Sequence, residues 1–228
     1  MKSWICGILS LLLIFSLIPT AGAQEMAGDI TAEVQITGTG YKNCDFLTDG
    51  ITGTYHTSTG NASVTLECNE GMAGIYLLFD LEYGAYTVTD HATGAVITAG
   101  EYGFLHEYID LEAAFGTSPR AVTVDFSHGK VRLSEITVYS SGQLPDTVQR
   151  WEPPVEGGAD LVLFSTHGDD EHLYFAGLLP TYAGQMQYRV QVVYLTDHRN
   201  DTYKRTHEML NGLWKVGVRA YPVFGGFA

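Results

Sequence analysis

The hydrophobic pattern changes its period once along this chain, and that change constrains the fold more than any other feature. In residues 30–36 and 64–68, and in further short segments up to residue 141, apolar residues alternate with polar ones, and glycine or Asp-Gly turns separate the segments. This pattern predicts an antiparallel β-sandwich. Residues 161–164 and 190–195 are instead continuous apolar runs, each followed by a helical pattern. Such an order predicts a parallel α/β sheet.

We therefore predict two domains. The sandwich spans residues 24–141, a linker rich in Ser, Gly and Pro spans 142–158, and the α/β domain spans 159–228. Within the α/β domain we expect helices at 170–183 and 203–216 and a third strand at 219–224. Three strands and two helices make a small parallel sheet, so we expect a truncated domain.

Residues 1–23 predict a secretory signal peptide. Lys2 precedes an apolar run at 5–18, and small residues at 21–23 offer a cleavage site. The alternative is a membrane anchor, but the run is shorter than the roughly 20 residues that a bilayer span requires. We predict a secreted or cell-surface protein with no membrane span in the mature chain.

Two cysteines, Cys44 and Cys68, remain after the predicted cleavage. In an exported protein they can form a disulfide or stay as buried free thiols. We expect them to lie close enough to form the bridge.

The charge balance narrows the choice of partners. Asp and Glu number 26 against 12 Lys and Arg, which gives a net charge of −14. Nucleic-acid binding needs clustered Lys and Arg, so nucleic acid is excluded as a partner.

Both ends of the first domain resemble a known family. Residues 46–50 read Phe-Leu-Thr-Asp-Gly, 54–58 read Thr-Tyr-His-Thr-Ser, and the segment 131–139 closes the domain. Together they resemble a discoidin-like (coagulation factor type C) domain, with Tyr55 where that family has Trp. The resemblance implies an eight-stranded jelly-roll sandwich whose loops bind sugars and, in some members, calcium.

Within this domain Tyr55 and His56 are the candidates for contact with a sugar ring, since both lie near one expected loop. The neighbouring Asp49 and Gly50 also have a simpler interpretation as a tight turn.

A chemically distinctive motif, Ser-Thr-His-Gly-Asp-Asp-Glu, occupies residues 165–171 between an apolar strand and a helix. His167 and Asp170 are three residues apart at this bend, so both side chains can point to one ion. Zinc takes nitrogen and oxygen ligands and leaves a position for water, from which Asp169 can accept a proton. The alternative is an acidic cluster that caps the helix.

The motif is similar to His-Pro-Asp-Asp-Glu of the N-acetylglucosaminyl-phosphatidylinositol de-N-acetylase (LmbE-like) family, and the resemblance runs from Ala159 to the chain end. It implies a Rossmann-like fold that removes acetyl groups with zinc. By position, His167 and Asp170 become zinc ligands, Asp169 the general base and Arg205 a substrate contact. For Arg205 and Glu208 a helical ion pair is the alternative.

The chain departs from that family in two places. Gly168 replaces the proline of the motif, and the family's third ligand, a downstream histidine, has no counterpart after His207. We expect the third ligand beyond residue 228. His172, His198 and His207 are the local candidates. The chain as it stands is therefore predicted to be inactive.

These observations predict an exported zinc-dependent N-deacetylase that acts on N-acetylglucosamine-type carbohydrate, with an accessory glycan-binding module. The predicted partner is a cell-wall or extracellular glycan, and the predicted cofactors are zinc and, in the first domain, calcium. Two alternatives remain. One is a cell-surface glycan-binding or adhesion protein with an inactive α/β domain, and the other is a purely structural sandwich.

Overall fold

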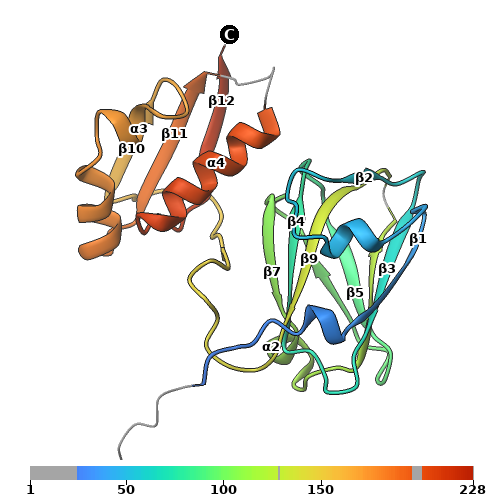
Figure 1. Ribbon diagram of the computed structural model, residues 1–228. Coiled ribbons are helices and arrows are strands. Elements are labelled where there is room, and N and C mark those ends of the chain that lie inside the picture. Colours follow the sequence, from blue (N-terminus) through green and yellow to red (C-terminus); the bar gives the residue numbers. More distant parts are fainter. Residues whose placement is uncertain (1–24, 128, 197–201, 228) are drawn as a thin grey trace, which may run out of the picture.

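The structure is a computed structural model that describes residues 25–127, 129–196 and 202–227, in two parts joined by one connection (Figure 1). The predicted signal peptide lies outside these ranges. No helix within them is long and apolar enough to cross a bilayer.

The first part consists of two antiparallel sheets packed face to face, which confirms the predicted sandwich. In the described residues one sheet has five strands in the order β1-β3-β8-β5-β6, and the other has four in the order β2-β9-β4-β7. The strands are β1 (Gln35–Thr39), β2 (His56–Thr57), β3 (Ala62–Glu67), β4 (Gly74–Phe79), β5 (Tyr86–Asp90), β6 (Val96–Ala99), β7 (His106–Asp110), β8 (Ala121–Phe126) and β9 (Arg132–Tyr139). The helical segments of this part are η1 (Thr31–Glu33), η2 (Asp45–Thr48) and α2 (Leu111–Phe115).

The alternating pattern forms the sandwich because it gives each strand one apolar face. Val64 of β3 pairs with Val124 of β8, and Leu66 pairs with Val122. All four side chains are fully buried between the sheets. Burying each such side chain contributes about 1.5–3 kcal/mol.

The alternation at residues 30–36 predicts a strand, and the structure confirms only its end. Residues Thr31–Glu33 form the 3-10 turn η1, and β1 begins at Gln35. The Asp29 carboxylate accepts hydrogen bonds from Thr31 N at 2.9 Å and Thr31 Oγ1 at 2.5 Å. This local bonding competes with strand formation at the start of the segment.

The predicted disulfide is absent, because Cys44 and Cys68 are both free thiols. Cys44 Sγ lies only 2.6 Å from the position that a Cβ on Gly38 would take, so this sulfur packs against β1. Cys68 is buried just after β3, where its N–H donates to Arg120 O at 2.8 Å. Each thiol therefore packs against its own neighbours and is not bonded to the other cysteine.

The second part holds a three-stranded parallel sheet in the order β10-β11-β12. Its elements are β10 (Leu161–Ser165), α3 (Asp170–Leu173), η3 (Pro180–Gln185), β11 (Val190–Thr196), α4 (Thr202–Lys215) and β12 (Val223–Phe227). The predicted parallel sheet and second helix are confirmed, and the Rossmann-like fold stays a prediction.

Two boundaries in this part differ from the prediction. The helix expected at 170–183 ends at Leu173, and a π-helical turn starts at Pro180. Proline is favoured in the first turn of a helix, where no N–H donor is needed, so Pro180 suits the start of a new helical segment better than the interior of one continuous helix. The third strand starts at Val223, later than expected.

The connection at 142–158 was predicted to be a linker, yet it is packed along much of its length. Val148 and Trp151 are buried. Glu152 forms a parallel bridge with Ala220. The connection therefore contacts the α/β part and does not act as a free spacer.

Candidate functional site

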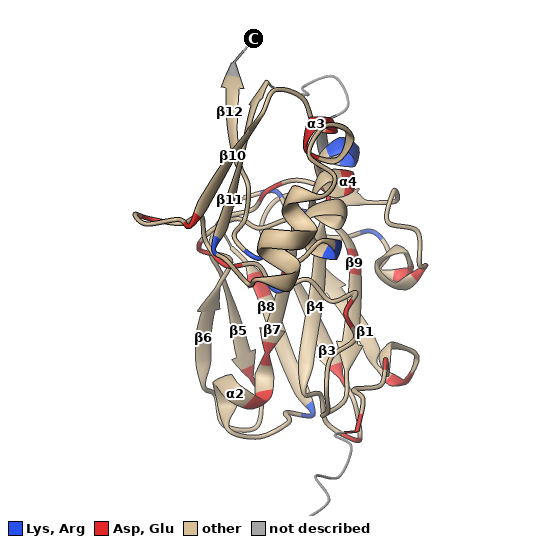
Figure 2. Ribbon diagram, turned by 90° about the vertical axis from the view of Figure 1, so that its left-hand side faces the viewer, with Lys and Arg blue, Asp and Glu red and all other residues tan. Residues whose placement is uncertain are grey.

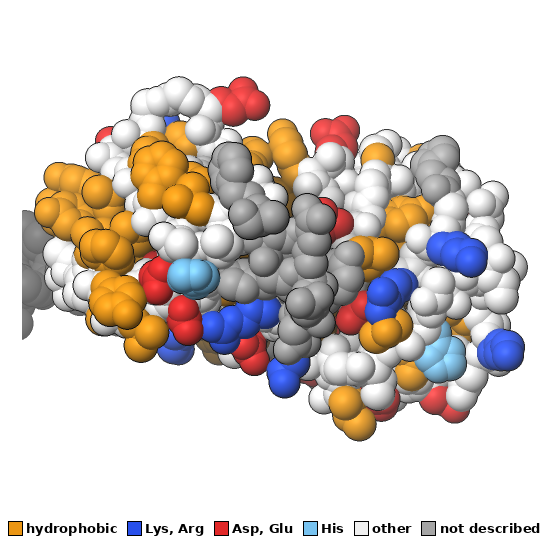
Figure 3. Space-filling view, turned by 90° about the horizontal axis from the view of Figure 1, so that it is seen from above, with side chains coloured by type: hydrophobic (Ala, Val, Ile, Leu, Met, Phe, Trp, Pro, Cys, Tyr) orange, Lys and Arg blue, Asp and Glu red, His pale blue; other side chains and the backbone are white. Residues whose placement is uncertain are grey.

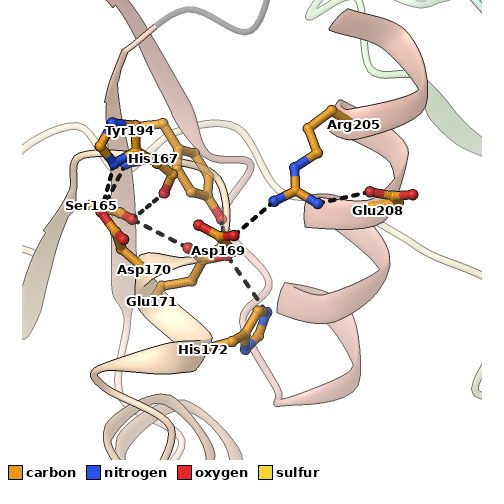
Figure 4. A network of polar contacts seen from close by, with 9 residues as sticks. All are labelled: Ser165, His167, Asp169, Asp170, Glu171, His172, Tyr194, Arg205 and Glu208. Carbon is orange, nitrogen blue, oxygen red and sulfur yellow. Dashed lines mark hydrogen bonds and ion pairs between the residues drawn. The ribbon is translucent and has the colours of Figure 1, made fainter. Parts of the chain in front are cut away.

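The motif of residues 165–171 lies at the carboxyl end of β10, next to the carboxyl end of β11 (Figure 4). The main chain fixes its position, since Thr196 N at the end of β11 donates to Thr166 O at 3.0 Å. Ligand sites of parallel α/β sheets form at this edge.

His167 and Asp170 converge as predicted. Asp170 Oδ2 lies 3.3 Å from His167 Nδ1 and accepts a hydrogen bond from His167 N at 3.0 Å. The His167 side chain is 61% exposed. Two ligands on a tetrahedral zinc, each at about 2.0–2.2 Å, lie roughly 3.4 Å apart. The nitrogen and oxygen are at hydrogen-bond distance from each other in the structure, and the same spacing also suits a shared cation.

Asp169 points to helix α4 (Figure 4). Its Oδ2 lies 3.1 Å from Arg205 Nη2, and Arg205 Nη1 donates to Glu208 Oε2 at 3.0 Å. The pKa of Arg205 is raised, first by its hydrogen bond to Glu208 and further by the Asp169 charge. The helical ion pair offered as the alternative for Arg205 is thus present, and Arg205 also reaches the motif.

The helix-capping interpretation does not hold for the Asp169 side chain. Asp169 occupies the N-cap position of α3, but its side chain makes no capping hydrogen bond. Its carboxylate stays half exposed and pairs with Arg205 instead. It is consequently open to a water molecule.

A buried network behind the motif went unrecognised in the sequence. Glu171 is fully buried and accepts a hydrogen bond from Tyr194 Oη at 2.7 Å. Ser165 Oγ lies 3.2 Å from the other Glu171 oxygen and 2.6 Å from His167 O. Burial, and then the Glu171 charge, raise the pKa of Tyr194. No sequence signal points to this network, because it depends on the register that pairs Ser165 of β10 with Tyr194 of β11.

Of the histidines proposed as local third ligands, the two that the structure describes do not join the pair. His172 is half buried against Gly212 of α4, with Nε2 buried and 3.6 Å from Glu171 Oε1. His207 faces the sandwich, where its Nδ1 lies 2.9 Å from His106 Nε2. His198 lies outside the described residues. Within the described ranges no three His, Cys, Asp or Glu side chains form a metal-binding group.

The face that carries the motif is mixed in character. Figure 3 shows a histidine among acidic and basic side chains, with hydrophobic side chains exposed beside them. On β10 and around α3 the exposed apolar side chains include Phe164, Leu173 and Tyr174. The motif therefore lies on an open surface.

In the sandwich, both candidate sugar contacts already pack against neighbours. The Arg132 guanidinium lies 3.9 Å from the centre of the Tyr55 ring. The His56 ring stacks on Phe46 at 4.0 Å. Both residues remain exposed at one end of the sandwich, so each can offer a ring edge or its remaining face.

Two carboxyl groups meet beside this loop. Asp49 Oδ1 accepts from Ile51 N at 2.7 Å, which confirms the tight turn, and its Oδ2 accepts from Thr54 Oγ1 at 2.9 Å. Burial, and then Asp49, raise the pKa of Glu135 to about 7, and Glu135 Oε1 is buried without a hydrogen-bond partner. Oxygen donors of this kind suit calcium, which Asp49, Glu135 and Thr54 would hold.

Comparison with known proteins finds similarity only among solved structures, since no family model and no curated protein matches the chain. One similar structure is CpGH89CBM32-6 produced by Clostridium perfringens, at 19% identity over 48% of this chain and 94% of that chain, with a TM-score of 0.38. A second is GH31 CBM32-2 bound to GalNAc, at 13% identity over 47% and 99%, with a TM-score of 0.35. A third is a pectin-binding carbohydrate-binding module, at 15% identity over 52% and 96%, also with a TM-score of 0.35.

Each of these neighbours is a carbohydrate-binding module and matches about half of this chain. Because the TM-scores are below 0.5, the likenesses by themselves assign no function. None of them bears on the predicted deacetylase.

Proposed function

We propose that the α/β part carries the site of a zinc-dependent N-deacetylase acting on N-acetylglucosamine-type carbohydrate, and that the sandwich is its glycan-binding accessory module. The observation that carries the proposal is the 3.3 Å separation of His167 Nδ1 and Asp170 Oδ2. This pair is open to solvent and lies at the carboxyl edge of a parallel sheet.

Each residue of the motif would have a separate role in the reaction. His167 and Asp170 would hold zinc, which polarises a carbonyl group and lowers the pKa of a bound water. Asp169, half exposed, would accept a proton from the attacking water. Arg205 orients the Asp169 carboxylate, and its guanidinium has enough N–H donors to contact the substrate as well.

The number of metal ligands limits what this chain does alone. Catalytic zinc sites generally use three protein ligands and one water, and the described residues supply two. His198, which follows β11 outside the described residues, is the remaining local candidate for a third ligand. We therefore propose weak zinc binding and little activity for these 228 residues.

Elemental analysis of zinc and an assay of acetate release from N-acetylglucosamine oligomers test this proposal. Asp170→Asn should lower the zinc content, because it removes one of two anchoring donors. Asp160→Asn is the matched control, since Asp160 lies before β10 and pairs with Arg189 at 3.9 Å, away from the motif. Equal zinc in wild type and Asp170→Asn would remove the metal assignment. Strong acetate release by this chain would make His198 the third ligand.

The glycan-binding role of the sandwich is supported by exposed rings at one end of it, Tyr55 beside Arg132 and His56 on Phe46. Among the similar structures, one is bound to GalNAc and another binds pectin. Tyr55→Ala should weaken binding of N-acetylglucosamine oligomers to immobilised protein. Binding without any zinc would favour the second candidate, a secreted or cell-surface glycan-binding protein with an inactive α/β part.

A further inference from the structure

The connection between the two parts borders three hollows in the surface, of about 740, 360 and 340 Å³. Arg150 lines all three, and Trp151 lines the two larger ones. The largest lies between the connection and the end of α4, and the second lies between the connection and β7. We call the two larger hollows together the junction cleft. Tyr102, Phe104 and Glu107 line one of these hollows, and Trp214, Lys215 and Arg219 line the other.

An exposed aromatic ring with firm support stands at the sandwich side of the cleft. Tyr102 is 61% exposed, and its ring stacks on Phe104 with centroids 5.5 Å apart and an interplanar angle of 15°. Phe104 is buried and stacks in turn on Tyr221 of the α/β part at 4.6 Å. Because Phe104 supports one face of Tyr102, the ring is held in place for a ligand, and little ordering is needed on binding.

The polar groups of the cleft are mixed in sign. The cations are Arg150, Lys215 and Arg219, and the carboxyl groups are Glu107, Asp110, Asp146 and Glu152. Figure 2 shows basic residues near the level where the parts meet, whereas the far end of the sandwich carries mainly acidic ones. The whole chain has a net charge of −14, whereas positive and negative side chains are nearly equal in number along this cleft.

Several of these groups are open to a ligand. The side chains of Arg150 and Lys215 form no hydrogen bond or ion pair with the residues that the structure describes. Burial raises the pKa of Glu107 to about 7, so near neutral pH this carboxyl can donate as well as accept a hydrogen bond. A sugar hydroxyl is both a donor and an acceptor, and a set of cations and carboxyls satisfies both functions.

We infer that the junction cleft binds an uncharged oligosaccharide, with a sugar ring stacked on Tyr102 and hydroxyl groups bonded to Arg150 and the surrounding carboxyls. Pockets of about 300–1,000 Å³ hold small-molecule ligands, and two adjoining hollows suit several sugar units better than one. The near balance of charge disfavours an ionic ligand. This site is separate from Tyr55 and from the zinc motif, and it does not rest on the proposed function.

Tryptophan fluorescence of the full chain tests the inference directly. Trp151 and Trp214 both line the cleft, and the third tryptophan, Trp4, lies outside the described residues. The probes are tetrasaccharides of N-acetylglucosamine, β-1,4-linked glucose and β-1,4-linked galactose. We expect at least one to cause a saturable change. Tyr102→Ala and Arg150→Gln should each weaken that binding about tenfold or more.

Matched variants separate this site from the others. Lys130→Gln removes one positive charge at an exposed position of the sandwich outside the cleft and should leave the affinity unchanged. Tyr102 and Arg150 belong to neither the proposed zinc site nor the Tyr55 site, so failure of the deacetylase proposal does not affect this result. The inference is overturned if no tetrasaccharide produces a saturable change, or if Tyr102→Ala and Arg150→Gln bind like wild type. Equal or tighter binding of tetragalacturonate would overturn the assignment to uncharged sugars.

Discussion

His106 of the sandwich and His207 of helix α4 meet across the boundary between the two parts, with Nε2 and Nδ1 2.9 Å apart. On its other side, His106 Nδ1 lies 2.6 Å from Tyr76 Oη. His106 is buried, and burial, followed by the His207 charge, holds its pKa well below the ordinary value. Burial also lowers the pKa of His207. The contact between the two parts thus includes two histidines that are neutral near pH 7.

Acidification should weaken the folded state through these histidines. Both pKa values are lowered in the folded chain, whereas an unfolded histidine titrates near about 6.5. Below that pH the unfolded state binds more protons, so each histidine lowers the free energy of unfolding by up to about 1.4 kcal/mol per pH unit. Urea unfolding at pH 7.5 and 5.5 measures the loss.

The double variant His106→Asn, His207→Asn is the comparison for this measurement. Glu107 and Glu135, with pKa values raised to about 7, act in the opposite direction, because they take up protons in the folded state. Both remain in the variant, so the difference between the two proteins isolates the histidines. An equal pH dependence in both would contradict the prediction.

Calcium should stabilise the sandwich through Asp49 and Glu135. A cation between them would satisfy the buried Glu135 oxygen and relieve the repulsion that raises the pKa of that carboxyl. At a concentration 100 times the dissociation constant, the free energy of unfolding should rise by about 2.7 kcal/mol. Thermal unfolding with calcium and with EDTA measures it, and Glu135→Gln should abolish the difference. A melting temperature insensitive to calcium in wild type would exclude the site.

Asp169→Asn should separate metal binding from turnover. Asparagine keeps the shape of the side chain but cannot accept a proton, so zinc content should stay constant while any acetate release that the wild type shows falls about 10²–10⁴-fold, or to the detection limit. The lost ion pair with Arg205 is solvent-exposed and should cost less than about 1 kcal/mol. Glu208→Gln, which removes the other partner of Arg205, should retain most of the activity. Full activity of Asp169→Asn would refute the role of general base.

Tyr194→Phe should destabilise the α/β part. The substitution leaves one oxygen of the fully buried Glu171 without its 2.7 Å hydrogen bond. An unsatisfied buried group costs about 1–3 kcal/mol, and more when it is charged. The shift of the urea midpoint measures this cost. Tyr188→Phe, at an exposed tyrosine, is the control and should change stability little. Equal midpoints for both variants would show that the network contributes nothing.

Two predicted elements differ from the structure because local interactions compete with the secondary structure that the hydrophobic period predicts. Thr31–Glu33 has the alternation of a strand, but the Asp29 side chain bonds to Thr31 and a 3-10 turn forms. Past Leu173 the helical pattern continues, yet the helix ends. Hydrophobic period alone overlooks such side-chain bonds and the preference of Pro180 for the first turn of a helix.

The sequence by itself determined the two-part architecture and the position of the motif. Alternation and continuous apolar runs decide which faces are buried, and burial of apolar surface is the dominant favourable term in folding. The convergence of His167 and Asp170 was also predictable, because they are three residues apart at one bend. Only the tertiary structure decided that Arg205 reaches Asp169, that Tyr194 bonds to Glu171 and that His207 turns away from the motif to meet His106. These partners are far apart along the chain, and their contacts exist only because sheet register and the packing of the two parts bring them together.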